Sequence, residues 1–137
     1  MDPRSTALVQ STTRTLVVEG DGHVRSVLTW LLEHDPRFVV AASLASGDSA
    51  VAFHHPLDAA LVDLAVPGLD ALSTTRLMRD RYPSLKILVM AGADVPYLRA
   101  AVLDAGADGL ATRALGAAAI VDTLAALRSL STAPPAA

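Results

Sequence analysis

Three carboxylates and one guanidinium stand where they could act together on a charged group. Glu19 and Asp21 follow a short aliphatic run. Asp63 and Arg113 each follow a further run of the same kind. Clustered carboxylates repel one another unless a cation joins them, and Mg2+ takes oxygen ligands of this type. A carboxylate beside such an ion can accept a phosphoryl group, whose oxygens a nearby cation stabilises. The residues therefore predict a candidate phosphoaspartate site at Asp63.

Each of these side chains also has a simpler interpretation. Asp63 could bond the backbone N–H groups of its own loop, and Glu19 and Asp21 could form a solvated acidic loop. Arg113 could pair with Asp63 and take the place of the cation, which would lock the site without a ligand. Asp70 is predicted to cap a helix rather than to react, because an aspartate there satisfies free N–H donors.

The elements that must position these residues are visible as five rounds of an aliphatic run and a helical pattern. Such alternation is typical of βα units with a parallel sheet. We expect an α/β fold with a doubly wound, five-stranded parallel sheet, flavodoxin-like, in the order 2-1-3-4-5 with helices on both faces. The expected strands are 15–18, 38–42, 57–62, 86–90 and 109–112, and the expected helices begin near 24, 48, 70, 95 and 116. Ligands of such folds bind beyond the carboxyl ends of the strands, where the charged residues fall.

Two local features of the expected helices can be compared with the structure. The second helix should be unusually short, because only fifteen residues separate Gly47 from Asp63 and they must also hold a strand. Trp30 lies off the apolar stripe of the first helix. It is predicted to be lateral core, with a partly exposed contact residue as the alternative.

Composition limits the classes of function. The chain has 137 residues, 52% of them hydrophobic and 18% charged, which suits one folded domain and excludes wholesale disorder. There is no cysteine, and the four histidines lack ligand spacing, so disulfides and zinc are not expected. The net charge of -3, with scattered basic residues, predicts no direct binding of nucleic acid. No signal peptide or membrane span is recognised, and a cytoplasmic location is expected.

The domain boundaries follow from composition. Residues 1–14 are expected to be a disordered tail, because they are rich in Ser and Thr without periodicity. Residues 15–130 should form the folded domain. Residues 131–137, with two prolines and three alanines, are expected to be a tail or the start of a linker.

Three short motifs occur in order along the expected domain. Asp63-Leu-Ala-Val-Pro-Gly-Leu-Asp70 is similar to an acceptor aspartate followed by a Met-Pro-Gly loop. In the protein family that carries the first motif, a Gly-Ala-x-Gly sequence precedes the last strand, and Gly106-Ala-Asp-Gly109 is similar to it. Leu16-Val-Val-Glu-Gly-Asp21 is similar to the acidic end of the first strand in that family. Through these motifs, residues 15–130 resemble the receiver domains of two-component response regulators.

The resemblance implies roles for single residues, and several positions depart from it. Asp63 falls on the phosphoacceptor position and Glu19 on the first residue of the acidic pair. Gly20 falls on the second acidic residue and supplies no metal ligand. Ala91 stands where the family has a Ser or Thr hydroxyl that bonds the phosphoryl group. Arg113 replaces the family's lysine with a larger planar cation.

A further departure is Leu110, which replaces an aromatic switch residue. The resemblance therefore implies an atypical, degenerate phosphorylation site, a pseudo-receiver in which phosphorylation of Asp63 is impaired. A weak Mg2+ site formed by Glu19, Asp21 and Asp63 is the only cofactor site expected.

The expected function is signal transduction without enzymatic activity. The resemblance implies a bacterial phosphorelay and transcription regulation through an output domain or a protein partner. A partner or homodimer is expected on the surface formed by helix 95–105, strand 109–112 and helix 116–130, and no membrane contact is expected. Two alternatives remain open. One is a module gated by a small molecule at the rim of Glu19, Asp63 and Arg113, and the other is a small hydrolase with Asp63 as nucleophile.

Overall fold

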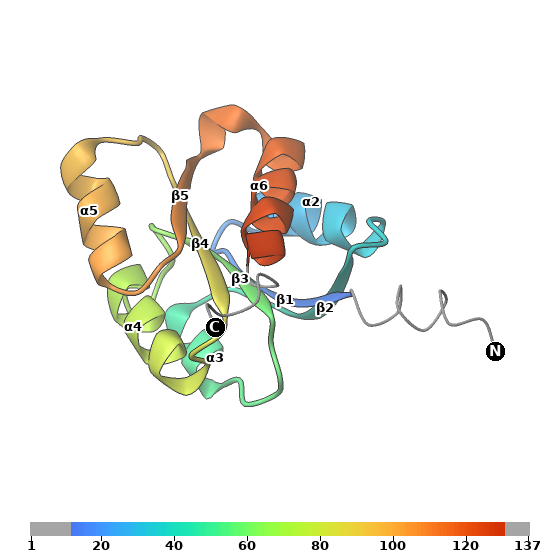
Figure 1. Cartoon of the computed structure of the whole chain (residues 1–137), viewed down its shortest axis with the longest axis horizontal. Helices are drawn as coiled ribbons and strands as arrows, with labels where there is room; N and C mark the ends of the chain where they lie inside the picture. The colour runs from blue at the N-terminus through green and yellow to red at the C-terminus, as the bar shows by residue number, and fades with distance from the viewer. Residues whose placement is uncertain (1–11, 131–137) are drawn as a thin grey trace, which may run out of the picture.

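Five parallel strands form the centre of the protein (Figure 1). The computed structural model describes residues 12–130. The strands are β1 (Thr13–Val18), β2 (Phe38–Leu44), β3 (Ala59–Asp63), β4 (Lys86–Ala91) and β5 (Gly109–Thr112). The helices are α2 (Gly22–Glu33), α3 (Gly47–Ala52), α4 (Ala71–Arg81), α5 (Pro96–Asp104) and α6 (Ala117–Leu130), with a 3-10 turn, η1 (Arg113–Leu115), after β5. The strand order is β2-β1-β3-β4-β5, which confirms the predicted topology.

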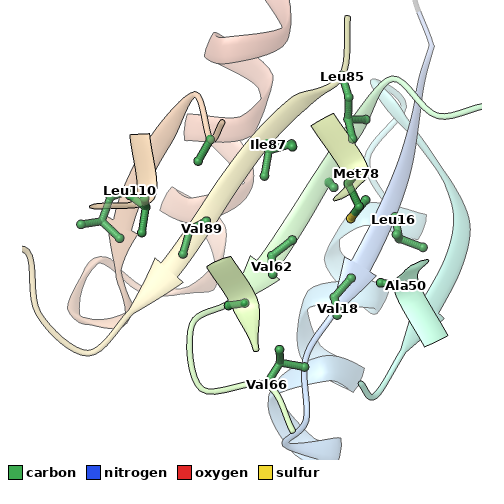
Figure 2. Close-up of a cluster of buried hydrophobic side chains, with 14 of the residues drawn as sticks. Leu16, Val18, Ala50, Val62, Val66, Met78, Leu85, Ile87, Val89 and Leu110 are labelled. Carbon is green, nitrogen blue, oxygen red and sulfur yellow. The ribbon is translucent and has the colours of Figure 1, made fainter. Parts of the chain in front are cut away.

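Helices cover both faces of the sheet. Helices α2 and α6 lie side by side on one face, and α3, α4 and α5 cover the other (Figure 1). Each face of the sheet has its own hydrophobic core. Figure 2 shows the core under α3, α4 and α5, to which three neighbouring strands contribute Leu16, Val62 and Val89. All five residues of β3 are buried, as expected for a central parallel strand with helices on both sides.

Side-chain caps determine where three of the helices begin. Asp21, Ser46 and Asp70 each accept a hydrogen bond from a backbone N–H in the first turn of α2, α3 and α4, respectively. Asp70 accepts from the N–H of Ser73 at 2.9 Å, so its predicted role as an N-cap is confirmed. Helix α3 has only six residues, which confirms that the second helix is short.

The first strand begins two residues earlier than predicted. Thr13 and Arg14, placed in the N-terminal tail by their composition, belong to β1. The N–H of Thr13 donates to the carbonyl of Arg37 at 2.9 Å, and that of Arg14 donates to Asp58 Oδ2 at 2.8 Å. These long-range bonds, invisible to local composition, extend the strand. The rest of the predicted tails, residues 1–11 and 131–137, lies outside the described residues.

Trp30 is not core, so that prediction was wrong. Its side chain is 58% exposed and stacks on His34 with ring centroids 4.2 Å apart. The buried stripe of α2 runs through Leu28 and Leu32, and Trp30 lies two positions from each, on the far side of the helix. Within residues 12–130, none of the helices combines the length and apolar character needed to cross a membrane.

Candidate functional site

Asp63, Glu19 and Arg113 come together at the carboxyl edge of the sheet. Asp63 is the last residue of β3 and Glu19 directly follows β1, and both are almost completely buried. Arg113 begins η1 after β5. Its Nη2 atom is hydrogen-bonded to Asp63 Oδ1 and lies 3.6 Å from Glu19 Oε1. The same guanidinium nitrogen therefore interacts with two buried carboxylates.

This arrangement decides between the simpler interpretations of Asp63 and Arg113. Among residues 12–130, the side-chain partner of Asp63 is Arg113, and no backbone N–H donates to its carboxylate. The hydrogen bond that Arg113 donates to Asp63, together with the negative charge of that carboxylate, raises the pKa of Arg113. The guanidinium thus occupies the position beside the Asp63 carboxylate that a phosphoryl group or a cation would need.

Glu19 is the most deeply buried carboxylate of the site. Its Oε1 accepts the N–H of Asp21 at 3.2 Å, whereas its buried Oε2 has no hydrogen-bond partner. Burial, and then the neighbouring charge of Asp63, raises the pKa of Glu19 above its ordinary value of 4.5. Arg25 holds the same loop, because its Nη1 donates to the Glu19 carbonyl at 2.7 Å.

The raised pKa of Glu19 predicts a pH-dependent effect of Glu19→Gln. The stability that a raised pKa contributes is present below the unfolded value of 4.5 and is lost as the pH rises through the folded value. A neutral glutamine does not incur this loss. We therefore expect Glu19→Gln to gain stability relative to the wild type as the pH rises above about 4.5, measured by urea unfolding.

Asp35→Asn is the matched control for this measurement. The hydrogen bond from Arg37 lowers the pKa of Asp35, so this variant should lose stability relative to the wild type as the pH rises. Parallel trends for the two variants would contradict the assignment of Glu19.

The Asp21 carboxylate caps α2. Its Oδ1 accepts the N–H groups of His23 and Val24 at 2.9 and 3.1 Å, and these two bonds lower the pKa of Asp21. Within the part of the chain that the structure describes, no group of three or more His, Cys, Asp or Glu side chains is arranged to hold a metal ion. The predicted set of Glu19, Asp21 and Asp63 is therefore not assembled.

The residues present fit a resident Mg2+ poorly. Glu19 Oε2 is a free oxygen, but Gly20 has no side-chain oxygen, Asp21 is bound to the start of α2, and Arg113 is bound to Asp63. Mg2+ is usually held by one or two carboxylates together with several water molecules. The poor fit comes from Arg113, whose positive charge already lies beside both Asp63 and Glu19.

Gly20 is also the point of closest approach between the first loop and the loop after Asp63. A Cβ atom at Gly20 would lie 2.5 Å from Cδ of Pro67. Overpacking costs ~1–3 kcal/mol, and a stiffer unfolded chain returns ~0.4–1 kcal/mol. Gly20→Ala is therefore expected to lower the free energy of unfolding by about 1 kcal/mol.

Two variants control this prediction, both measured by urea unfolding. At Gly22, the nearest atom to an added methyl group would be Nη2 of the flexible Arg25 side chain, at 3.7 Å. Gly22→Ala should therefore be neutral or stabilising. Pro67→Ala removes the clashing Cδ and should reduce the cost of Gly20→Ala. An unchanged cost in the Pro67→Ala background would contradict the steric explanation.

The loop that follows Asp63 is held by α3, a contact that the sequence did not reveal. The N–H of Gly47 donates to the carbonyl of Pro67 at 3.1 Å, and Asp48 Oδ2 accepts the N–H of Leu69 at 3.1 Å. A Cβ at Gly47 would clash with the Leu69 carbonyl oxygen. The Gly-Asp pair was visible as a helix start, but nothing local connects it to a loop twenty residues later.

Ala91 and Leu110 lie on β4 and β5, the last two strands of the sheet. Ala91 ends β4, one residue beyond Met90, the register partner of Asp63, and it offers only a methyl group there. Leu110 is 6% exposed and belongs to the core under α3, α4 and α5. It is packed as an ordinary core residue.

The protein has a five-stranded parallel sheet of this order, and a buried aspartate at the end of β3 pairs with a cation from the end of β5. Together these features define a receiver-like domain. The family model described as the response regulator receiver domain matches residues 15–125. The chain belongs to the response regulator receiver domain family.

Several characterised proteins are similar to this chain. The transcriptional regulatory protein CseB of Streptomyces avermitilis is 36% identical over 110 residues, which cover 80% of this chain and 46% of CseB. A protein-glutamate methylesterase/protein-glutamine glutaminase of Rhodospirillum centenum is 33% identical over 100 residues, which cover 66% of this chain and 25% of that protein. The chain thus spans between a quarter and about a half of the length of these relatives.

Solved structures agree with the fold. A two-component response regulator of the LuxR family from Aurantimonas superposes with a TM-score of 0.79 at 26% identity, covering 87% of this chain and 86% of that chain. The receiver domain of the putative response regulator NarL from Mycobacterium tuberculosis gives a TM-score of 0.80 at 21% identity, covering 87% and 98%.

Proposed function

We propose that this chain is a pseudo-receiver, a signalling domain that acts through protein contacts and accepts a phosphoryl group at Asp63 poorly. The observation that carries the proposal is the hydrogen bond between Arg113 Nη2 and Asp63 Oδ1. A phosphoryl donor must displace this guanidinium from the acceptor oxygen or approach around it. Arg113 also approaches Glu19, so displacing it would leave two buried carboxylates without their cation.

The missing groups support the same proposal. Gly20 offers no side-chain oxygen as a ligand, and Ala91 offers no hydroxyl to a phosphoryl group on Asp63. A lost hydrogen bond to a charged group is worth ~1.5–3 kcal/mol, and a lost electrostatic group in a transfer site costs ~10²–10³ in rate. Both the transfer and its coupling to the shape of the domain should therefore be weak.

The partner surface in this proposal is the one formed by α5, β5 and α6. Tyr97, in the first turn of α5, is 80% exposed, and Leu103 on the same helix is 43% exposed. Large exposed apolar side chains are typical anchors of protein contacts. A second copy of the chain, or an output domain like those implied by the names of its relatives, is the proposed partner, in the cytoplasm of a bacterium. The small hydrolase is not proposed, because Asp63 is already bound to Arg113.

The coupling part of the proposal is tested with beryllium fluoride and Mg2+, a stable mimic of a bound phosphoryl group. Because Ala91 cannot bond the mimic, we expect no saturable amide shifts in Leu110, Tyr97 or the rest of the proposed partner surface, measured by 15N-resolved NMR. The spectrum of Asp63→Asn should be as insensitive to addition of the mimic as that of the wild type. Saturable shifts on that surface that vanish in Asp63→Asn would show an intact switch.

A further inference from the structure

A cavity opens between α2 and α6, next to the site formed by Asp63, Glu19 and Arg113. Its volume is about 210 Å³. The walls are aliphatic and come from α2, β4 and α6: Val24, Val27, Leu28, Met90 and Ile120. Such a space is smaller than the ~300–1,000 Å³ of a drug-sized site, so it suits a ligand with one compact apolar group.

The two polar side chains that line this cavity are both basic. They are His23, at the start of α2, and Arg113, and no carboxylate lines the cavity. A mostly apolar pocket with a few convergent polar groups is the usual form of a small-molecule site. Because both polar lining groups can carry positive charge, the complementary ligand carries a negative charge.

Arg113 has donors to spare for such a ligand. Its contacts with Asp63 and Glu19 both use Nη2. Among residues 12–130, no acceptor is hydrogen-bonded to Nη1 or Nε of this side chain. A guanidinium donates through five N–H groups in a planar fork, so a carboxylate can bind while Asp63 keeps its bond.

The start of α6 adds to the preference for an anion. Ala117, the first residue of the helix, lines the cavity, and the first turn contains no acidic residue. Gly116, directly before it, has no side chain to accept from the first N–H groups. The first turn of α6, where the helix dipole is positive, therefore lies beside the cavity without an acidic residue of its own.

We propose that this cavity binds a small carboxylate with one compact apolar group, such as an arylalkanoate. The apolar group packs among Val27, Leu28 and Ile120, and the carboxylate binds the free donors of Arg113. Inorganic phosphate or acetate would leave the apolar walls unfilled, and a neutral hydrocarbon would leave the guanidinium unused. The inference stands apart from the proposed pseudo-receiver function, because it requires only that the cavity and Arg113 are present.

The test uses the full chain and 3-phenylpropionate as the probe, followed through the methyl signals of Val24, Val27 and Ile120 by 13C-resolved NMR. We expect saturable shifts, with binding at least tenfold tighter than that of the neutral analogue 3-phenylpropan-1-ol, since one charged hydrogen bond is worth a tenfold change or more. Arg113→Gln should abolish this preference. Arg76→Gln, which removes an exposed arginine that does not line the cavity, should retain it.

Two further variants fill the cavity from opposite walls. Ala117→Leu and Val27→Trp should each reduce the affinity for 3-phenylpropionate at least tenfold, and either one suffices if the other does not fold. Absence of saturable shifts in the wild type would overturn the proposal. So would equal affinity for the acid and the alcohol, or undiminished binding in a folded cavity-filling variant.

Discussion

Arg113→Met is expected to lower the free energy of unfolding by about 2 kcal/mol, or about 8 °C in melting temperature. The reason is that Arg113 Nη2 is hydrogen-bonded to Asp63 and approaches Glu19, and both carboxylates are almost fully buried. Removing one partner of a fully buried ion pair costs ~3–5 kcal/mol, because the remaining charge stays desolvated. The side chain of Arg113 is itself 43% exposed, so solvent screening reduces the expected loss.

Arg37→Met is the matched control. Arg37 also contacts two carboxylates, Asp35 and Asp122, and it is 49% exposed, close to the value for Arg113. Its partners are more accessible to water, however, and exposed pairs contribute ~0–1 kcal/mol. We expect Arg37→Met to cost no more than about 0.5 kcal/mol in urea unfolding. Equal losses for the two variants would contradict the buried-carboxylate explanation.

A second substitution separates charge from packing at the same place. Asp63→Asn in the Arg113→Met background removes one of the two buried charges that have lost their cation. It should therefore restore part of the lost stability. If Asp63→Asn added its own loss to that of Arg113→Met, the effect of Arg113 would have to be one of packing alone.

Phosphorylation of Asp63 is expected to be slower than at a complete receiver site by more than two orders of magnitude. Gly20 gives no side-chain oxygen for a cation, Ala91 gives no hydroxyl, and Arg113 is already hydrogen-bonded to the Asp63 carboxylate. One missing electrostatic group costs ~10²–10³ in rate, and here more than one group is altered. An incoming phosphoryl group also adds negative charge beside Glu19, whose Oε2 is already unpartnered.

Restoring the missing groups should reverse this defect in part. The variant Gly20→Asp, Ala91→Thr, Arg113→Lys supplies an oxygen ligand, a hydroxyl and a smaller cation. The rate at which its Asp63 is phosphorylated should exceed that of the wild type by tenfold or more. The gain should be limited by Pro67, whose Cδ would lie 2.5 Å from a Cβ at position 20. A rate no higher than that of the wild type would mean that these three positions do not explain the defect.

The fold and the location of the site could be predicted because their signals are local or periodic. The continuous apolar run before Asp63 is visible in the sequence, and it forms the fully buried β3. The alternation of strands and helices then places Asp63, Glu19 and Arg113 at the same edge of the sheet. The short α3 followed from the number of residues available before Asp63.

What could not be predicted depends on contacts between distant segments. Whether Asp63 bonds its own loop or Arg113, fifty positions later, is decided by the side-chain directions at the end of β5. Asp21 was expected either in a cation site or in a solvated loop, whereas its carboxylate caps the first turn of α2. The exposure of Trp30 depends on the rotation of α2 relative to the sheet, which its apolar pattern alone specified too loosely.

The most direct measurement for the pseudo-receiver is the intact mass of the protein after incubation with acetyl phosphate and Mg2+. Asp63→Asn serves as the blank, and the restored variant serves as the positive comparison. The arrangement of Arg113, Gly20 and Ala91 predicts that most of the wild-type protein keeps its unmodified mass. Rapid, nearly complete addition of one phosphoryl group to the wild type, absent in Asp63→Asn, would contradict it and establish an ordinary phosphorylation switch.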